Sequence, residues 1–208
     1  MRPECLSGDW QVLKTFSTPD ISDALDGLYS LSHHIRHQMT CPPGRVVGPA
    51  FTVKLPPGDN LSLHQALKHV VKGDVLVVQS LAGSTAVCGD LLAHKLHYQG
   101  AAAVIIDGYI RDVPGFQTLD MPVYARGCMP TGPQKNGPGE INVPVACGMQ
   151  VVMPGDCIVA DEMGIVVIPT QKVEQVILRL VKQSPAQEAY REHVVSGAFN
   201  AQNLKGAP

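Results

Sequence analysis

The first part of the chain has apolar residues at the spacing of an amphipathic helix. These residues are Ile21, Ala24, Leu25 and Leu28. Thr18 or Asp20 can cap the helix, and Pro19 suits its first turn because proline lacks the backbone N–H that stays unpaired there. The pattern predicts a short helix within residues 17–28 that buries one face.

The middle of the chain alternates strand and helix patterns. Residues 44–55, "GRVVGPAFTVKL", have the β-branched and aromatic content of a strand that is bent or interrupted at Gly48-Pro49. A second helix, ended by Gly73, precedes the strand "DVLVVQS". The apolar face of that helix consists of Leu63, Ala66, Leu67, Val70 and Val71.

The same helix-and-strand unit then appears again. Residues 89–100 have a helical pattern, and residues 101–107, "AAAVIID", form an apolar run typical of a strand buried on both faces. Alternation of this kind indicates an α/β fold with a partly parallel sheet.

After residue 120 the pattern changes to short β segments separated by Gly and Pro. These segments are "MPVYA", "INVPVACG", "MQVVMPGDCIVAD" and "GIVVIP". They predict a second, largely antiparallel or barrel-like layer built against the first. A C-terminal helix follows, and Ser184-Pro185 predicts a break before a last helical piece. We expect a single domain over residues 1–208, with a core at about 17–186 and a loose or subunit-contacting tail at 197–208.

Composition limits the classes of partner. The chain has 208 residues, of which 45% are hydrophobic and 16% charged, as in an ordinary globular domain. Its formal net charge is -2 with no cluster of Lys and Arg, so we expect neither nucleic-acid nor membrane binding. The sequence shows no secretory leader and no spanning segment, which predicts a cytoplasmic protein. Its six cysteines form no C-x-x-C pair and predict neither disulfides nor a zinc site.

Two charged residues follow the apolar strand in "VIIDGYIRDV". We expect the strand to end at a turn formed by Asp107-Gly108, which places Arg111 and Asp112 just beyond its carboxyl end. In open α/β sheets that edge is where ligands bind. The alternative is a surface salt bridge, or a helix cap by Asp112.

A second feature points to the same edge. In "CGDLLAHKL", Gly89 and Asp90 begin a helix whose free N–H groups and dipole can hold a carboxylate or phosphate. Asp90 and Asp112 are hard oxygen donors suited to Mg²⁺ or Mn²⁺, and Arg111 can pair with a carboxylate or oxyanion through its planar fork. Taken singly, an aspartate in the first turn of a helix is most often structural.

The histidines are a weaker candidate for a metal site. His33, His34 and His37 lie close together in "LSHHIRH", but no acidic or cysteine residue stands at ligand spacing. We interpret this stretch as a polar loop, and His94 and His97 as residues on a helix surface.

Several of these stretches resemble one protein family. The segments are "GDNLSLHQAL", "KGDVLVV", "GDLLAHKLHYQGAAAVIIDGYIRD", "MPVYARG" and "INVPVACGMQVVMPGDCIVADEMGIVVIP". They resemble the regulators of ribonuclease activity type A, or RraA-like proteins, and the related 4-hydroxy-4-methyl-2-oxoglutarate/4-carboxy-4-hydroxy-2-oxoadipate aldolases. The resemblance implies an α/β/β sandwich akin to a swivelling phosphohistidine-type domain. It also implies a homotrimer, or a hexamer of two trimers, with active sites between subunits.

The resemblance also assigns site residues. The G-D-L-L turn of the aldolases, here Gly89, Asp90, Leu91 and Leu92, binds the pyruvyl carboxylate. The R-D pair, here Arg111 and Asp112, contacts substrate oxygen and the divalent metal, with Asp112 as metal ligand. Cleavage also needs a base for the C4 hydroxyl, and we expect a metal-bound water oriented by Asp90 to fill that role.

Two functions therefore remain open. The first is a class II pyruvate aldolase that uses Mg²⁺ or Mn²⁺ to cleave 4-hydroxy-4-methyl-2-oxoglutarate or 4-carboxy-4-hydroxy-2-oxoadipate to pyruvate and a 2-oxo acid. The same enolate arises when oxaloacetate loses CO₂, so decarboxylase activity is expected to accompany cleavage. The second is a non-catalytic regulator that binds a ribonuclease.

Overall fold

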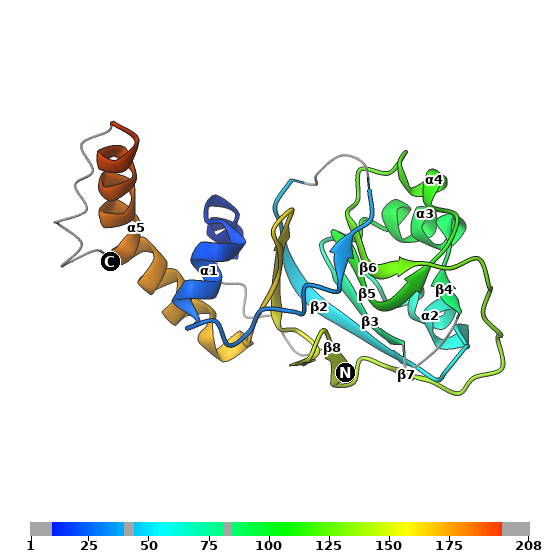
Figure 1. Cartoon of the computed structure of the whole chain (residues 1–208). Helices are drawn as coiled ribbons and strands as arrows, with labels where there is room; N and C mark the ends of the chain where they lie inside the picture. Colours follow the sequence, from blue (N-terminus) through cyan, green and yellow to red (C-terminus); the bar gives the residue numbers. More distant parts are fainter. Residues whose placement is uncertain (1–9, 40–43, 81–84, 197–208) are drawn as a thin grey trace.

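The computed structural model describes residues 10–39, 44–80 and 85–196. Its strands are β1 (Arg36–His37), β2 (Val46–Leu55), β3 (Val75–Ser80), β4 (Ala86–Cys88), β5 (Ala103–Ile110), β6 (Val123–Cys128), β7 (Glu140–Ile141), β8 (Val145–Cys147), β9 (Gln150–Val152), β10 (Cys157–Asp161) and β11 (Gly164–Ile168). Nine of them form one sheet in the order β1-β6-β5-β3-β2-β10-β11, with β4 beside β5 and β7 beside β2. The sheet curves into a nearly closed barrel (Figure 1).

A short segment, residues 30–37, closes this barrel. The Leu31 N–H donates to the Ile165 carbonyl of β11 at 2.9 Å. A few residues later the chain enters β1, which pairs antiparallel with β6. The segment therefore links β11, at one end of the strand order, to β6 near the other end.

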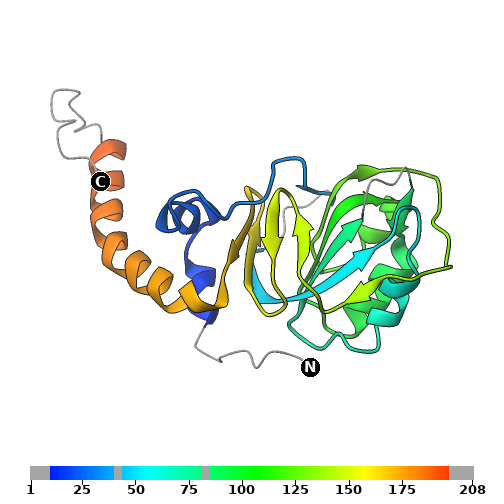
Figure 2. The same cartoon turned by 90° about the horizontal axis from the view of Figure 1, so that it is seen from below.

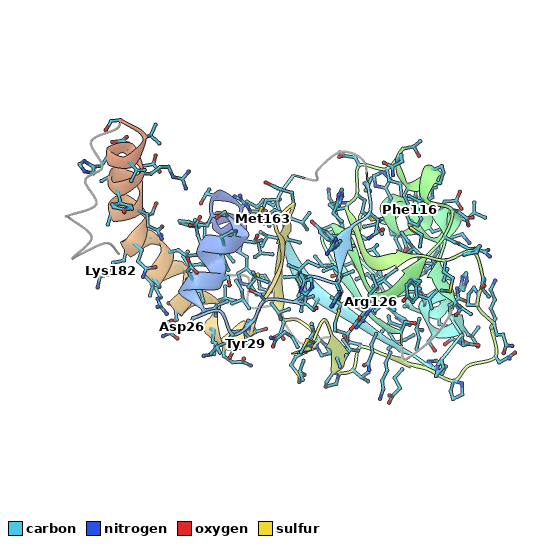
Figure 3. The ribbon with its side chains drawn as sticks, in the orientation of Figure 1. Asp26, Tyr29, Phe116, Arg126, Met163 and Lys182 are labelled. Carbon is cyan, nitrogen blue, oxygen red and sulfur yellow. The ribbon has the colours of Figure 1, made fainter. Side chains whose placement is uncertain are left out.

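Helices cover one face of the parallel strands β2, β3, β5 and β6. They are α2 (Leu61–Ala66), α3 (Asp90–Tyr98) and α4 (Val113–Phe116), seen together in Figure 1. Apolar side chains of the sheet and these helices form one buried cluster, which includes the fully buried Phe116 labelled in Figure 3. The second predicted helix is shorter than its sequence pattern, because turns follow Ala66 and leave Val71 exposed.

Strand β2 continues through Gly48-Pro49, where we expected it to bend or be interrupted. It changes partners there: Val46–Pro49 pair antiparallel with β10, and Ala50–Leu55 pair parallel with β3. Gly48 is required because a Cβ at this position would lie 2.2 Å from the Gly73 carbonyl oxygen. The glycine therefore marks a close backbone approach between two segments.

The predicted antiparallel layer is confirmed for β10 and β11 and for the separate hairpin β8–β9. The "MPVYA" segment is an exception, because β6 joins the sheet parallel to β5. The hairpin covers the face of the sheet opposite to α2, α3 and α4, and both layers share a second apolar cluster. Helix, sheet and β-hairpin layers together confirm the predicted α/β/β arrangement.

A third cluster lies under η1 (Trp10–Thr15), α1 (Thr18–Ala24) and α5 (Val173–Val195), the last preceded by η2 (Thr170–Lys172). Helix α1 is capped by Ser17 and not by Thr18 or Asp20 as we expected. Asp20 takes part as the reciprocal member of a capping box with Ser17. Thr18 is instead buried, and its hydroxyl donates to the carboxylate of Asp161 at 2.6 Å.

Helix α5 runs through Pro185, where a break was predicted. The proline lies on a stretch of the helix where few side chains are buried, so no packed neighbour opposes a local adjustment of the backbone. The helix changes direction along its length in Figure 2, and Lys182 in Figure 3 lies well away from the sheet. None of the helices among the described residues is long and apolar enough to cross a membrane. The predicted tail, 197–208, lies outside the described residues.

Candidate functional site

A cavity of about 300 Å³ lies where β4 and β5 end and α3 begins. Every residue that the sequence assigned to the site lines it, namely Gly89, Asp90, Leu91, Leu92, Arg111 and Asp112. The structure therefore brings together the two motifs, which are separated by about two turns of helix and a strand in the chain.

Strand β5 positions Arg111 and Asp112 by a route that differs from our prediction. The chain does not turn at Asp107-Gly108 but continues as strand to Ile110, paired with β4 on one side and β6 on the other. Gly108 permits this because a Cβ there would lie 2.7 Å from the Ser80 Cβ. Arg111 and Asp112 still follow directly after the carboxyl end of the strand, as predicted.

Arg111 and Asp112 form a half-exposed ion pair. The Arg111 Nε lies 3.3 Å from Asp112 Oδ2. The side chain of Arg111 is 44% exposed to solvent and that of Asp112 is 50% exposed. Asp112 adopts a left-handed backbone conformation with φ of 60° at the start of α4, which directs the chain sharply away from the strand. Gly132 leaves room for the Arg111 guanidinium, because a Cβ at position 132 would lie 2.6 Å from Arg111 Nη1.

Asp90 and Gly89 stand directly beside this pair. Gly89 is the N-cap of α3, and a Cβ on it would meet Asp112 Oδ2 at 2.7 Å. The carboxylate of Asp90 accepts a hydrogen bond from the Leu91 N–H at 2.6 Å. One of the helix N–H groups predicted to hold an anion therefore already has a hydrogen-bond partner. A ligand carboxylate that uses this amide must displace the Asp90 side chain from it.

Three residues with polar or charged side chains that the sequence interpretation missed also line the cavity: Asn60, His64 and Lys135. Asn60 and His64 come from the start of α2, and Lys135 comes from the loop between β6 and β7. Partial burial, reinforced by the charges of Lys135 and Lys95, holds the pKa of His64 below its ordinary value. Asn60 and His64 lie in the segment "GDNLSLHQAL", which carries part of the family resemblance, but its local pattern does not indicate a contact with the site.

Asp59 holds the loop that carries Lys135. Its buried carboxylate accepts hydrogen bonds from the backbone N–H groups of Leu61, Asn136 and Gly137. Burial raises the pKa of this carboxyl, but the three donors outweigh burial and place the pKa below its ordinary value. One carboxylate thus joins the start of α2 to the loop over the cavity.

The donor set fits a hard divalent cation that keeps most of its water. The described residues contain no group of three or more His, Cys, Asp or Glu side chains that could hold a metal. Mg²⁺ is commonly bound through only one or two protein carboxylates, and the half-exposed Asp112 beside Asp90 can supply them. The absence of side-chain bulk at Gly89 leaves Asp112 Oδ2 accessible from the cavity.

The other candidates lie elsewhere. His33 and His34 lie in an exposed loop with tilted rings whose centroids are 4.1 Å apart. His37 differs from the predicted polar loop, because it lies in β1 and packs edge-on against Tyr124. His94 and His97 are exposed on α3 as predicted. Cys88 is buried beside the cavity, where burial and the nearby Asp90 raise the pKa of its thiol to about 12, so it is not a thiolate nucleophile at neutral pH.

Comparison with known proteins adds to this picture. The sequence model of the RraA-like family, described as Aldolase/RraA, matches residues 18–167. A protein of Halalkalibacterium halodurans named "Putative 4-hydroxy-4-methyl-2-oxoglutarate aldolase" is 38% identical over 184 residues, covering 88% of this chain and 86% of that protein.

Solved structures of similar fold carry the other name of the family. RraAS2 of Streptomyces coelicolor, titled an unusual member of the RNase ES inhibitor RraA protein family, matches with a TM-score of 0.78 and 28% identity over 88% of this chain and 96% of its own. The RNA-processing inhibitor RraA of Thermus thermophilis matches with a TM-score of 0.67 and 27% identity over 74% of this chain and 93% of its own.

Proposed function

This chain belongs to the RraA-like family, and from that premise we propose that it is a divalent-metal-dependent aldolase. Its substrates would be 4-hydroxy-2-oxo acids such as 4-hydroxy-4-methyl-2-oxoglutarate or 4-carboxy-4-hydroxy-2-oxoadipate. The products would be pyruvate and a second 2-oxo acid, and oxaloacetate would be decarboxylated at the same site. The proposal makes the protein a carbon-carbon lyase.

One observation carries the proposal: Arg111, Asp112 and Asp90 meet in one cavity that also receives the N-terminus of α3. This arrangement offers a guanidinium, two carboxylates and helix N–H groups to a small anionic ligand. A 2-oxo acid presents a carboxylate and a neighbouring keto oxygen, so it can use the cationic and the metal-binding groups together.

The chain's own residues would act as follows. The N–H groups of the Gly89–Leu92 turn would bind the substrate carboxylate once the Leu91 N–H is released from Asp90 and the Leu92 N–H from the Gly89 carbonyl. Arg111 would donate to the keto oxygen where negative charge develops. Asp90 orients the water that takes the C4 hydroxyl proton as the C3–C4 bond breaks, and the bond's electron pair passes into the enolate of pyruvate. Protonation of that enolate at C3 gives pyruvate. A divalent cation held by Asp112 would supply Lewis-acid stabilisation of the enolate charge.

A second candidate function is a non-catalytic regulator that binds a ribonuclease. It rests on two solved structures, whose titles name the RNase ES inhibitor RraA family and an RNA-processing inhibitor. The cavity favours the enzyme. A protein-binding regulator has no need of a glycine at position 89 that keeps a side chain off the Asp112 carboxylate.

The test is pyruvate release by the purified protein from 4-hydroxy-4-methyl-2-oxoglutarate and from oxaloacetate, with Mg²⁺ or Mn²⁺ and again with EDTA. We expect turnover that EDTA abolishes and that Asp112→Ala lowers at least a hundredfold at an unchanged melting temperature. Asp120→Ala, a change of an exposed aspartate outside this cavity, is the matched control and should retain wild-type turnover.

Two results would contradict the proposal. Metal-dependent activity that survives in Asp112→Ala would remove Asp112 from the metal site. A folded wild-type protein that releases no pyruvate from any of these substrates would leave the regulator as the better interpretation, and capture of a purified ribonuclease would then be the decisive assay.

A further inference from the structure

A cavity of about 430 Å³ lies at the end of the sheet opposite to the candidate site. Its wall includes the residues directly before three of the parallel strands, namely Arg45 before β2, Ala102 before β5 and Pro122 before β6. The candidate site lies where β4 and β5 end, and the two cavities share no lining residue. The proposed function leaves this second cavity without a role.

We infer that this cavity is a separate binding site, which takes a small organic acid with one carboxylate and an apolar body. The carboxylate pairs with Arg45 and Lys14, and the apolar body lies against the apolar side chains of the wall. The inference goes beyond the proposed function and does not depend on it.

The first argument is the position of Arg45. Its Nε lies 3.3 Å from the Asp161 carboxylate, and its Nη1 donates to the Lys14 carbonyl at 2.7 Å. The side chain is only 25% exposed, so the guanidinium is held in place at the cavity wall. Nη2 has no hydrogen-bond acceptor among the described residues and can donate to a ligand carboxylate.

The second argument is the excess of positive charge beside Arg45. Lys14 lines the same cavity, and within the part of the chain that the structure describes no acidic side chain forms an ion pair with it. Asp161 compensates Arg45 but is buried and does not line the cavity. The acidic residue in the wall, Asp120, is exposed, so solvent screens its charge. A ligand in the cavity therefore meets more positive than negative charge.

His37 also lines the cavity but adds no charge at neutral pH. Burial lowers the pKa of its imidazole below the ordinary value, although a hydrogen bond with the Met39 backbone acts in the opposite direction. The ring packs edge-on against Tyr124. His37 is therefore a neutral part of the wall, and the cationic groups are those of Arg45 and Lys14.

The third argument is the apolar remainder of the wall. Leu119 and Met121 belong to the buried cluster between the sheet and its helices, so core packing holds them in place. An apolar body gains free energy by leaving water for such a wall, and a simple inorganic anion cannot use it. The volume of the cavity suits a small ligand with one ring. The apolar lining residues are Met39, Val46, Ala102, Leu119, Met121 and Pro122.

Benzoate is the probe for this site, because it has one carboxylate on an apolar ring. Calorimetric titration of the purified protein in EDTA measures its affinity. Benzyl alcohol keeps the ring without the charge, and acetate keeps the charge without the ring. We expect each to bind at least about tenfold more weakly than benzoate, because each uses only half of the site. Acetate that binds as tightly as benzoate would overturn the site.

Two variants test the two parts of the wall. Lys14→Ala removes a charge but keeps the backbone carbonyl that Arg45 binds, and it should weaken benzoate binding about fivefold. Ala102→Leu adds bulk at the cavity wall and should weaken benzoate binding at least about tenfold. Thermal melting checks that each variant is folded. Unchanged benzoate affinity in either folded variant would contradict the inference.

The matched control is a lysine far from the cavity. Lys182 is exposed on α5 and lies well away from the sheet (Figure 3). Lys182→Ala makes the same change of charge as Lys14→Ala and should bind benzoate as the wild-type protein does. A loss of affinity equal to that of Lys14→Ala would mean that net charge, and not a site, controls the binding.

Competition separates this site from the proposed active site. We expect benzoate affinity to be unchanged by excess pyruvate and by Arg111→Ala, because Arg111 lines only the other cavity. Benzoate that pyruvate displaces, or that Arg111→Ala no longer binds, would place it in the other cavity and overturn this inference while the proposed function stands. A wild-type protein that binds benzoate as expected but releases no pyruvate from the aldol substrates would contradict the proposed function alone.

Discussion

At the scale of single residues, the glycines around the cavity show how closely its charged groups are packed. Gly89 and Gly132 each leave space that a methyl group would take from Asp112 or Arg111. Neither glycine has an unusual φ, so they are required for space and not for backbone freedom. The site is therefore sensitive to changes that add bulk without removing any charge.

Gly89→Ala tests this directly. The new Cβ would lie 2.7 Å from Asp112 Oδ2, so the carboxylate must move, and we expect at least a tenfold loss of metal-dependent turnover. Gly44→Ala is the control, because its Cβ would meet nothing within 4 Å. The measurement is kcat together with the apparent Mg²⁺ affinity. Wild-type values for Gly89→Ala would mean that Asp112 does not need its observed position.

The residues of the site were predictable to different degrees. Arg111 and Asp112 are adjacent in sequence and follow an apolar strand, so position alone indicated a ligand edge. Asn60 and Lys135 lie far apart in the chain and meet through a hydrogen-bonded loop. Nothing in the composition or spacing of either segment reports that contact.

At the scale of elements, sequence periodicity identified most helices and strands but missed their ends and their partners. Strand β5 passes Gly108 because the flanking strands β4 and β6 pair with the residues beyond it. Helix α5 passes Pro185 because that part of the helix packs against little. In both cases tertiary surroundings, which the local pattern does not contain, outweigh the local signal for a turn or a break.

The inner part of α5 is expected to contribute strongly to stability. Leu180 is 3% exposed in the cluster beneath α1, whereas Leu178 on the same helix is 65% exposed. Leu180→Ala should lower the free energy of unfolding by about 2–5 kcal/mol, as is typical for a buried leucine. Leu178→Ala is the matched control and should change it by less than about 0.5 kcal/mol. Urea denaturation measures both, and equal effects would contradict the packing described for α5.

At the scale of the whole molecule, we propose that several copies of the chain assemble, as a trimer or a hexamer. The outer part of α5 and the tip of the β8–β9 hairpin both present apolar side chains to solvent. They include Met149, Val151, Val181 and Val195. Surfaces of this kind are typical of contacts between proteins.

Light scattering coupled to size exclusion tests the assembly. We expect a mass three or six times the chain mass of 22.2 kDa. Met149→Asp combined with Val151→Asp should lower that mass if the hairpin is part of the interface, because a buried unpaired charge is strongly unfavourable. A wild-type mass of one chain would contradict the proposal.

The closure of the barrel has a consequence for how the chain reaches its native state. Residues 30–37 pair with strands that come late in the sequence, and Thr18 is bound by the carboxylate of Asp161. During synthesis on the ribosome these early segments cannot form all of these contacts until β10 and β11 have emerged. Contacts so distant along the chain slow folding. We therefore expect α1 and β1, although synthesised first, to be among the last elements to form their native contacts. We also expect a chain stalled before residue 161 to need protection from aggregation.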